Sequence, residues 1–293
     1  MPIKTVAFIG AGNMGAPMTR NARAAGFDIL ICDRNPAVLD EFRAEGVRVT
    51  DTIADCAGED AVVVLLANDQ QIMATLTGPG GLAASIPAGH APLVCMMSTT
   101  LPHTLLALQG SLAAAGARLI DAPVSGGIVG AQDGTLSILL GGAGDDVEAA
   151  TPLMESMGKN IFHCGALGAG EVVKVINNII CIANIFLTAE AVQLAEAHGV
   201  SYEALTPITS VSTGLNFLTK DAAMGRRQFA QWAKTPESYR AVHDVVAKDL
   251  HFALRLSDLA GMPKPLIRAV SEYVDSYDPA AMERWMACGR VGQ

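Results

Sequence analysis

The sequence predicts an α/β protein with a doubly wound, mainly parallel sheet in its first half and an all-helical second half. In the first half, short apolar runs rich in β-branched residues alternate with helical stretches, which is typical of parallel strands covered on both faces. After about residue 166 glycine becomes sparse, strand signals vanish, and one long helical segment follows. We therefore expect an α/β domain over 1–165 and a helical domain over 166–293, begun by a long interdomain helix.

The expected strands of the first half are 3–9, 27–33, 61–67, 92–98, 117–123, 136–142 and 160–166. The expected helices between them are 13–25, 36–45, 68–76 and 101–115. Asn35 before Pro36 marks a helix start, and Gly26 and Gly46 stand where a left-handed C-cap favours glycine. In the second half we expect helices at 169–198, 201–213, 215–231, 237–260 and 265–277.

Composition narrows the function classes. Of 293 residues, 51% are apolar and 17% are charged, which suits a large core rather than a disordered chain. The net charge is −9, and no basic tract is longer than Arg226-Arg227, so we expect no nucleic-acid partner. The stretch 175–195 is interrupted by asparagines and Glu190, which predicts a buried helix and no membrane partner.

The cysteines indicate the compartment. The six are far apart, form no CxxC motif and have no histidine at metal-ligand spacing. They are typical of reduced thiols, and the first expected strand leaves no room for a signal peptide. We expect a cytoplasmic protein without a bound metal.

A glycine motif lies between the first expected strand and helix. Residues 10–15, Gly10-Ala11-Gly12-Asn13-Met14-Gly15, fit the pattern GxGxxG. In a dinucleotide-binding unit these glycines make a tight turn, admit the pyrophosphate and let the helix pack on the strand. The next expected strand ends at Asp33, whose carboxylate would bind ribose hydroxyls and repel a 2′-phosphate. The motif predicts a dinucleotide and favours NAD, while Arg34 leaves NADP open.

Other candidate residues follow strand ends, because ligands of a doubly wound sheet bind beyond the carboxyl ends of its strands. Leu66 lies at one such end, and Ser98 and Thr99 lie at another. Ser125-Gly126-Gly127 follows a third, and offers a hydroxyl and bare backbone amides that can close on a carboxylate.

Five segments together resemble the β-hydroxyacid dehydrogenases. They are GAGNMGAPM (10–18), DRNP (33–36), DAPVSGG (121–127), DGTLSILLGG (133–142) and GAGEVVKVINN (168–178). The resemblance runs from about residue 3 to Ala260. It implies a Rossmann domain, a helical substrate and dimerisation domain, and an NAD(P)-dependent oxidoreductase that interconverts a small β-hydroxyacid and its semialdehyde or keto acid. It also implies a homodimer or homotetramer.

The resemblance assigns roles to residues of this chain. It implies a general acid/base at Lys174, with Asn178 one helical turn further on. It places the substrate carboxylate at Ser125-Gly126-Gly127. It places the hydroxyl of Thr99, at a strand end, beside the nicotinamide. It places Ser98 next to Thr99, on the substrate side, and Lys248 over the cofactor. Ala67, Met97 and the stretch 221–246 depart from the family pattern, which leaves the substrate's identity open.

The residues themselves also favour Lys174 as a catalytic group. Lys174 and Asn178 are four apart in the apolar run VVKVINNIICIANIF, so they share one face of a helix. A desolvated lysine becomes competent for proton transfer near neutral pH. Two alternatives remain: an imine reductase, which generally lacks this lysine, and a dinucleotide-binding protein without catalysis.

Overall fold

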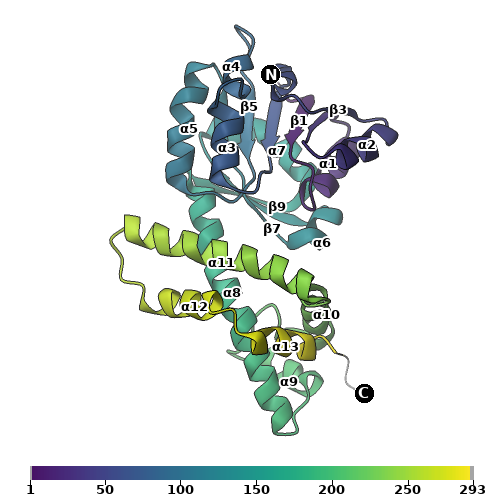
Figure 1. Ribbon diagram of the computed structural model, residues 1–293, viewed down its shortest axis with the longest axis vertical. Coiled ribbons are helices and arrows are strands. Elements are labelled where there is room, and N and C mark those ends of the chain that lie inside the picture. The colour runs from purple at the N-terminus through teal and green to yellow at the C-terminus, as the bar shows by residue number, and fades with distance from the viewer. Residues whose placement is uncertain (1, 291–293) are drawn as a thin grey trace. The chain divides into compact units, whose positions relative to one another are not determined.

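The computed structural model describes residues 2–290, and it divides into two compact units. The division falls between Lys174 and Val175, inside the long helix α8 (Ala169–Ala197), whereas the sequence analysis placed the boundary at 165. Each unit is described separately below. Figure 1 shows the strands confined to the first unit and the second unit built from helices alone.

The first unit is organised around one sheet of nine strands. The strands are β1 (Thr5–Ile9), β2 (Asp28–Cys32), β3 (Arg48–Thr50), β4 (Ala61–Val64), β5 (Leu93–Met96), β6 (Arg118–Asp121), β7 (Val124–Ser125), β8 (Leu136–Gly141) and β9 (Gly158–Gly165). Their order is β3-β2-β1-β4-β5-β6-β8-β7, with β9 paired to β8. Only the β6–β8 and β7–β8 pairs among these are antiparallel, which confirms the predicted doubly wound, mainly parallel sheet.

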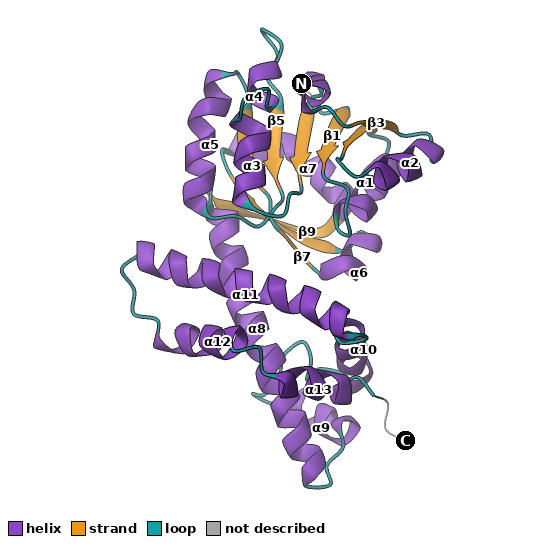
Figure 2. Cartoon of the chain, in the orientation of Figure 1, coloured by secondary structure: helices purple, strands orange, loops and turns teal. Residues whose placement is uncertain are grey.

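Helices cover both faces of this sheet (Figure 2). They are α1 (Gly15–Ala24), α2 (Pro36–Ala44), α3 (Asp69–Thr77), α4 (Leu82–Ser85), α5 (Pro102–Ala114), α6 (Gly127–Gln132) and α7 (Gly144–Met157), together with a 3₁₀ helix at Ile53–Gly58. Successive strand residues point to opposite faces. Phe8 accordingly packs in one core cluster with α1, α2 and α7, while Ile9 packs in a second with α3, α4 and α5.

The strand register brings the glycine motif and its acidic partner to one edge. Ile9 pairs with Cys32 on one side and with Val64 on the other. The residues that follow these three therefore leave the sheet at the same carboxyl edge, where ligands of such sheets bind.

The helix α7 was not predicted. Pro152 lies inside it, and proline normally interrupts a helix. Here Val147, Leu153 and Met154 are buried in the core cluster on one face of the sheet. Packing of this apolar face outweighs the missing backbone hydrogen bond.

The second unit is helical, as expected. Besides its part of α8, it contains α9 (Tyr202–Thr209), α10 (Ala222–Trp232), α11 (Pro236–Leu259), α12 (Pro265–Asp275) and α13 (Pro279–Cys288). The last was not expected. The helix expected at 215–231 begins only at Ala222, because Asp221 caps it by accepting the N–H of Met224 at 2.7 Å.

The stretch 221–246, which departs from the family pattern, forms α10 and the first part of α11 and supplies core residues. Phe229 and Tyr239 are buried. The ring centroid of Tyr239 lies 5.1 Å from that of Trp285, and Nε2 of His243 donates to the carbonyl of Val274 at 2.9 Å. These aromatic contacts are typical of a packed core.

The helix α8 is less buried than expected. By length and composition alone it could cross a membrane, with a mean hydropathy of 1.8. Only a third of its most apolar window is buried inside the structure. Ile182, Ile185 and Ala189 pack in the core of the second unit. Ile180 and Leu187 on the same helix are exposed. A helix that buries one apolar face in its own domain gives this pattern.

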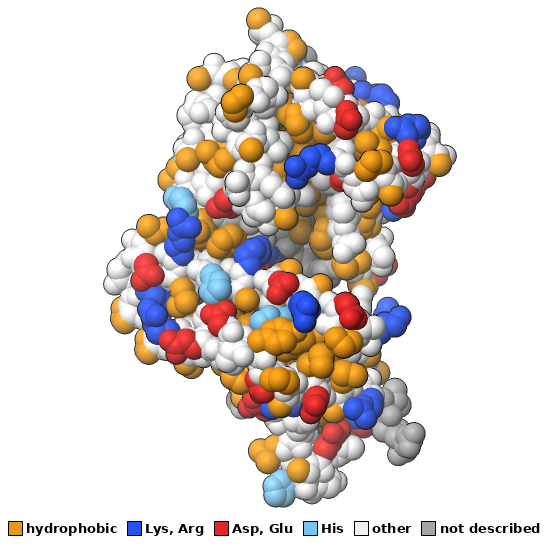
Figure 3. Space-filling view, in the orientation of Figure 1, with side chains coloured by type: hydrophobic (Ala, Val, Ile, Leu, Met, Phe, Trp, Pro, Cys, Tyr) orange, Lys and Arg blue, Asp and Glu red, His pale blue; other side chains and the backbone are white. Residues whose placement is uncertain are grey.

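Charge is mixed on the visible surface. On the face drawn in Figure 3, Lys and Arg side chains are dispersed among Asp and Glu rather than gathered into one basic patch.

Candidate dinucleotide site and helix α8

At two of the three glycines of the turn, the neighbouring backbone leaves no room for a side chain. Gly10 has a φ of +93°, and a Cβ there would lie 2.3 Å from the carbonyl oxygen of Leu65. A Cβ on Gly15 would lie 2.3 Å from the carbonyl oxygen of Gly10. Side chains at these two positions are excluded because the turn, strand β4 and helix α1 approach so closely.

Gly12 differs from both. A Cβ at Gly12 would meet no atom within 4 Å, so no contact inside the protein requires glycine there. Gly12 instead borders a cavity of about 660 Å³, a volume in the range of small-ligand sites. The open space beside this backbone is what a dinucleotide's pyrophosphate requires, so the residues present fit the cofactor.

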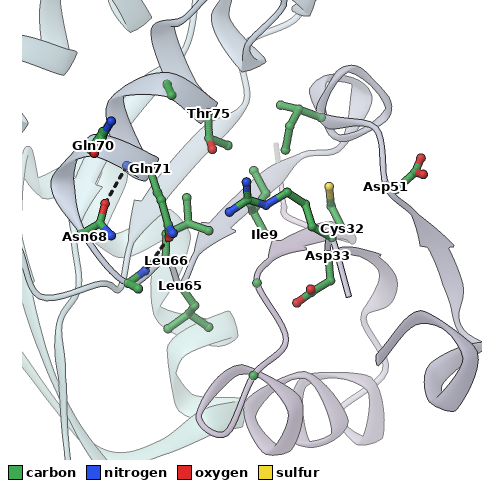
Figure 4. Close-up of a pocket in the computed structure, with 16 residues that line it drawn as sticks. Ile9, Cys32, Asp33, Asp51, Leu65, Leu66, Asn68, Gln70, Gln71 and Thr75 are labelled. Atoms are coloured by element: carbon green, nitrogen blue, oxygen red, sulfur yellow. Dashed lines mark hydrogen bonds between the residues drawn. The ribbon is translucent and has the colours of Figure 1, made fainter. Parts of the chain in front are cut away.

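The cavity is lined by several of the predicted cofactor residues. Gly10, Asp33, Arg34 and Leu66 all line it. Figure 4 shows Leu66, Gln71 and Thr75 on one side of the cavity and Cys32, Asp33 and Asp51 on the other. Ala11, Asn13 and Met14 belong to the same turn without lining the cavity.

Asp33 has a structural role. Its Oδ2 accepts the backbone N–H of Ala11 at 2.8 Å, and its Oδ1 accepts that of Asn35 at 2.9 Å. The side chain remains half-buried at the cavity wall, beside the exposed Arg34. A carboxylate in this place presents negative charge to whatever occupies the cavity.

The predicted residues after β4 and β5 are tied to each other. The buried hydroxyl of Ser98 donates to the carbonyl of Val64 at 3.2 Å and accepts the N–H of Leu66 at 2.7 Å. Ser98 thus holds the end of β4 in place, and its predicted substrate contact stays a prediction. Thr99 is half-buried, and its predicted place beside the nicotinamide likewise stays a prediction.

Ser125-Gly126-Gly127 joins β7 to α6. Gly126 and Gly127 have φ values of +132° and +65°, and a Cβ on Gly127 would meet nothing within 4 Å. The positive φ values favour glycine at both positions, and the space beside Gly127 is open.

Asp121 fixes the start of α8. It is fully buried at the end of β6, and its carboxylate accepts the N–H of Gly168 at 2.6 Å and that of Glu171 at 2.9 Å. Burial raises the pKa of Asp121, while these N–H donors act in the opposite direction. Lys174 follows one turn after Glu171, so the helix that carries it begins on a defined anchor.

Lys174 and Asn178 lie four residues apart on α8, as predicted, but both are half-buried rather than buried. Ile176 and Ile180, apolar neighbours on the same helix, are exposed as well. In the second unit, Asn178 donates its Nδ2 to Oδ2 of Asp249 at 2.7 Å.

Lys248 lies next to Asp249 on α11, with Nζ 3.1 Å from Oδ1 of Asp249. The same Nζ lies 4.9 Å from the ring centroid of Phe252, within the range of a cation–π contact.

Sequence reasoning missed residues in each of the two units. Gln71 and Thr75 of α3 line the cavity. They were missed because the sequence analysis considered only the residues that directly follow a strand, and these two lie further on, in the helix. Asp249 was not singled out, although it stands directly beside Lys248. Asp121 opens the DAPVSGG segment, but only its later residues were assigned a role. Within residues 2–290, no group of three or more His, Cys, Asp or Glu side chains could hold a metal ion.

Known proteins share both parts of the chain. Residues 5–165 match the family described as the NAD-binding domain of 6-phosphogluconate dehydrogenase. Residues 168–285 match the family described as NAD-binding of NADP-dependent 3-hydroxyisobutyrate dehydrogenase. The chain is thus similar to NAD(P)-dependent dehydrogenases over nearly its whole length.

Individual relatives agree with these matches. The NAD-dependent L-serine dehydrogenase of Pseudomonas aeruginosa is 33% identical over 273 residues, covering 90% of this chain and 89% of its own. The 3-hydroxyisobutyrate dehydrogenase of the same organism is 37% identical over 213 residues, with 72% and 71% covered. The structure of Mycobacterium tuberculosis 3-hydroxyisobutyrate dehydrogenase with L-serine aligns at a TM-score of 0.81 and 27% identity, covering 99% of this chain and 100% of that one. The chain therefore belongs to the β-hydroxyacid dehydrogenase family.

Proposed function

We propose that this protein oxidises a small β-hydroxyacid at its hydroxyl carbon, with NAD as the favoured cofactor and Lys174 as the general acid/base. The observation that carries the proposal is helix α8, which begins on the buried Asp121 and presents Lys174 and Asn178 one turn apart. A bound nicotinamide would accept the hydride from the carbon.

The chain's own residues handle the proton and the oxygen. Oxidising an alcohol requires removal of the hydroxyl proton, and the neutral amine of Lys174 would accept it at Nζ. In the reverse direction the ammonium returns the proton to the carbonyl oxygen. The amide of Asn178 would hold that oxygen in line, since an i, i+4 pair shares one helix face.

The segment at β7 and the start of α6 supports the proposed substrate class. Gly126 and Gly127 carry no side chain, a Cβ on Gly127 would meet nothing within 4 Å, and Ser125 adds a hydroxyl. Such a loop suits a carboxylate. Relatives named for L-serine and 3-hydroxyisobutyrate act on acids with the hydroxyl on the β-carbon, so a substrate of that class is the best-supported choice.

The preference for NAD rests on Asp33. Its carboxylate lines the cavity and is fixed there by two backbone N–H groups. Negative charge at this point accepts ribose hydroxyls and repels a 2′-phosphate. Arg34 lines the same cavity, so NADP is the second cofactor to test.

The test is a substrate screen with wild-type protein and Lys174→Ala. In the oxidation assay, wild-type protein is given NAD or NADP and one of 3-hydroxyisobutyrate, L-serine, glycerate and threonate. In the reduction assay, it is given NADH or NADPH and one of succinic semialdehyde, tartronate semialdehyde and glyoxylate. General acid/base groups contribute about 10²–10⁴-fold to rate, so Lys174→Ala should lose at least about a hundredfold in kcat and still bind NADH. Lys159→Ala, an exposed lysine of the first unit, is the matched control and should keep wild-type turnover.

Two results would contradict the proposal. Undiminished turnover in Lys174→Ala would remove the lysine from the mechanism. Silence across the whole panel by a wild-type protein that binds NADH would favour the dinucleotide-binding alternative without catalysis.

A further inference from the structure

Asp249 is a buried carboxylate to which the proposed reaction assigns no role. Only 6% of its surface is exposed, and each of its oxygens faces a different polar side chain. Oδ2 accepts Nδ2 of Asn178 at 2.7 Å, and Oδ1 lies 3.1 Å from Nζ of Lys248. One carboxylate therefore connects the two residues of the second unit that were assigned to the site.

The charge of Asp249 is balanced by Lys248. Among residues 2–290, Oδ1 of Asp249 has no hydrogen-bond donor, and its compensation is the ion pair with the lysine ammonium. A buried carboxylate is tolerated only when its charge is paired. The partly exposed side chain of Lys248 supplies that pairing.

The amide of Asn178 is oriented by this contact. An asparagine amide has a donor end and an acceptor end, whereas a carboxylate can only accept. Nδ2 must therefore face Asp249, and Oδ1 lies on the other side, 3.4 Å from Nδ2 of Asn177. Because the amide is planar, the direction of the second N–H of Asn178 is fixed by the first.

We propose that Asp249 is a positioning residue that sets the orientation of the Asn178 amide, with Lys248 as its counter-ion. The catalytic consequence rests on the proposed function, but the orientation does not. When Lys174 removes the hydroxyl proton, negative charge develops on the substrate oxygen. The remaining N–H of Asn178 stabilises that charge, whereas a flipped amide would present its carbonyl oxygen and repel it.

Two substitutions of Asp249 separate its roles. Asp249→Leu keeps the branching at Cγ and replaces both acceptor oxygens with methyl groups. Asp249→Asn keeps one oxygen that can accept from Asn178 and lacks the charge. Asp244→Asn is the matched control, because Asp244 lies on the same helix with 74% of its side chain exposed and makes the same change in charge.

The first measurement is the side-chain amide signal of Asn178 in ¹H–¹⁵N spectra of ligand-free protein, assigned by its loss in Asn178→Asp. In wild-type protein one amide proton should be shifted downfield by the carboxylate. The shift should be lost in Asp249→Leu, reduced in Asp249→Asn and unchanged in Asp244→Asn. An unchanged signal in Asp249→Leu would overturn the positioning role, whatever the protein's substrate.

The second measurement is turnover. We expect kcat to fall at least about tenfold in Asp249→Leu and less in Asp249→Asn, with NADH affinity changed by less than kcat. A lost amide shift together with wild-type kcat would refute the catalytic consequence. A wild-type protein that is silent on every hydroxyacid would refute the proposed function, while the amide signal would still decide the orientation.

Discussion

The carboxylate of Asp33 accepts the backbone N–H of Ala11 at 2.8 Å, so the residue on which the proposed preference for NAD rests also ties the end of β2 to the glycine turn. Its two roles can be separated by substitution. Asp33→Ala removes the acceptor and the charge together, whereas Asp33→Asn retains an oxygen that can accept from Ala11.

Asp33→Asn should narrow the preference for NADH over NADPH, because the repulsion of a 2′-phosphate falls while the turn keeps its hydrogen bond. Asp33→Ala should narrow the same preference for NADH over NADPH. It should also weaken the binding of both cofactors, since the turn loses its anchor. Fluorescence titration with NADH and NADPH measures both effects. Asp51→Asn, which lowers the negative charge lining the same cavity, is the control. An equal change in that variant would assign the preference to the summed charge of the cavity.

Gly12 and Gly15 should respond differently to alanine. A Cβ on Gly15 would come within 2.3 Å of the Gly10 carbonyl oxygen, while one on Gly12 would meet nothing within 4 Å. Gly15→Ala should therefore lower the free energy of unfolding by about 1–3 kcal/mol, as overpacking does. Gly12→Ala should keep its melting temperature but bind NADH at least tenfold more weakly, because its methyl group enters the cavity. Equal affinity in wild type and Gly12→Ala would show that the dinucleotide lies elsewhere.

The parts of the site that the sequence predicts are those set by local rules. The GxGxxG spacing, the acid at the end of the next strand and the strand-end position of Leu66 each follow from a repeating βα unit. Asn178 and Asp249 are 71 residues apart, and their contact depends on how two helices pair. Helical periodicity identifies the apolar face of each helix but not its partner. Helix α7 escaped prediction for a related reason, because its packing overrides the local effect of Pro152.

The ion pair between Glu203 and Arg226 should make stability depend on pH. Hydrogen bonds from the buried guanidinium at 2.5 and 2.9 Å lower the pKa of Glu203 from 4.5 to about 2. A lowered folded-state pKa contributes stability that is present above pH 4.5 and lost as the pH falls toward 2. Because Glu203 is half-exposed, we expect Glu203→Gln to cost only about 1 kcal/mol at pH 7.

Urea denaturation of wild type and Glu203→Gln across pH 7 to 3 checks this dependence. The difference between the two proteins should be constant down to about pH 5 and shrink below it. A difference that persists unchanged at pH 3 would mean that lost packing, and not lost charge, destabilises the variant.

The exposed face of α8 predicts self-association. Ile180, Leu187 and Leu194 are 59%, 66% and 63% exposed and stand seven residues apart, the spacing of a helix seam that packs against another helix. We expect a second copy of the chain to cover this face. Leu187→Glu should therefore reduce the molar mass measured by light scattering to that of a monomer at micromolar concentration.

Val211→Glu introduces the same charge at a site that is 85% exposed but outside α8, and should leave the assembly unchanged. If wild-type protein already has the mass of a monomer, or if both variants dissociate alike, the face of α8 is not the contact. Because burying one leucine gains about 1.5–3 kcal/mol, a single buried glutamate in each copy is sufficient to shift the equilibrium measurably.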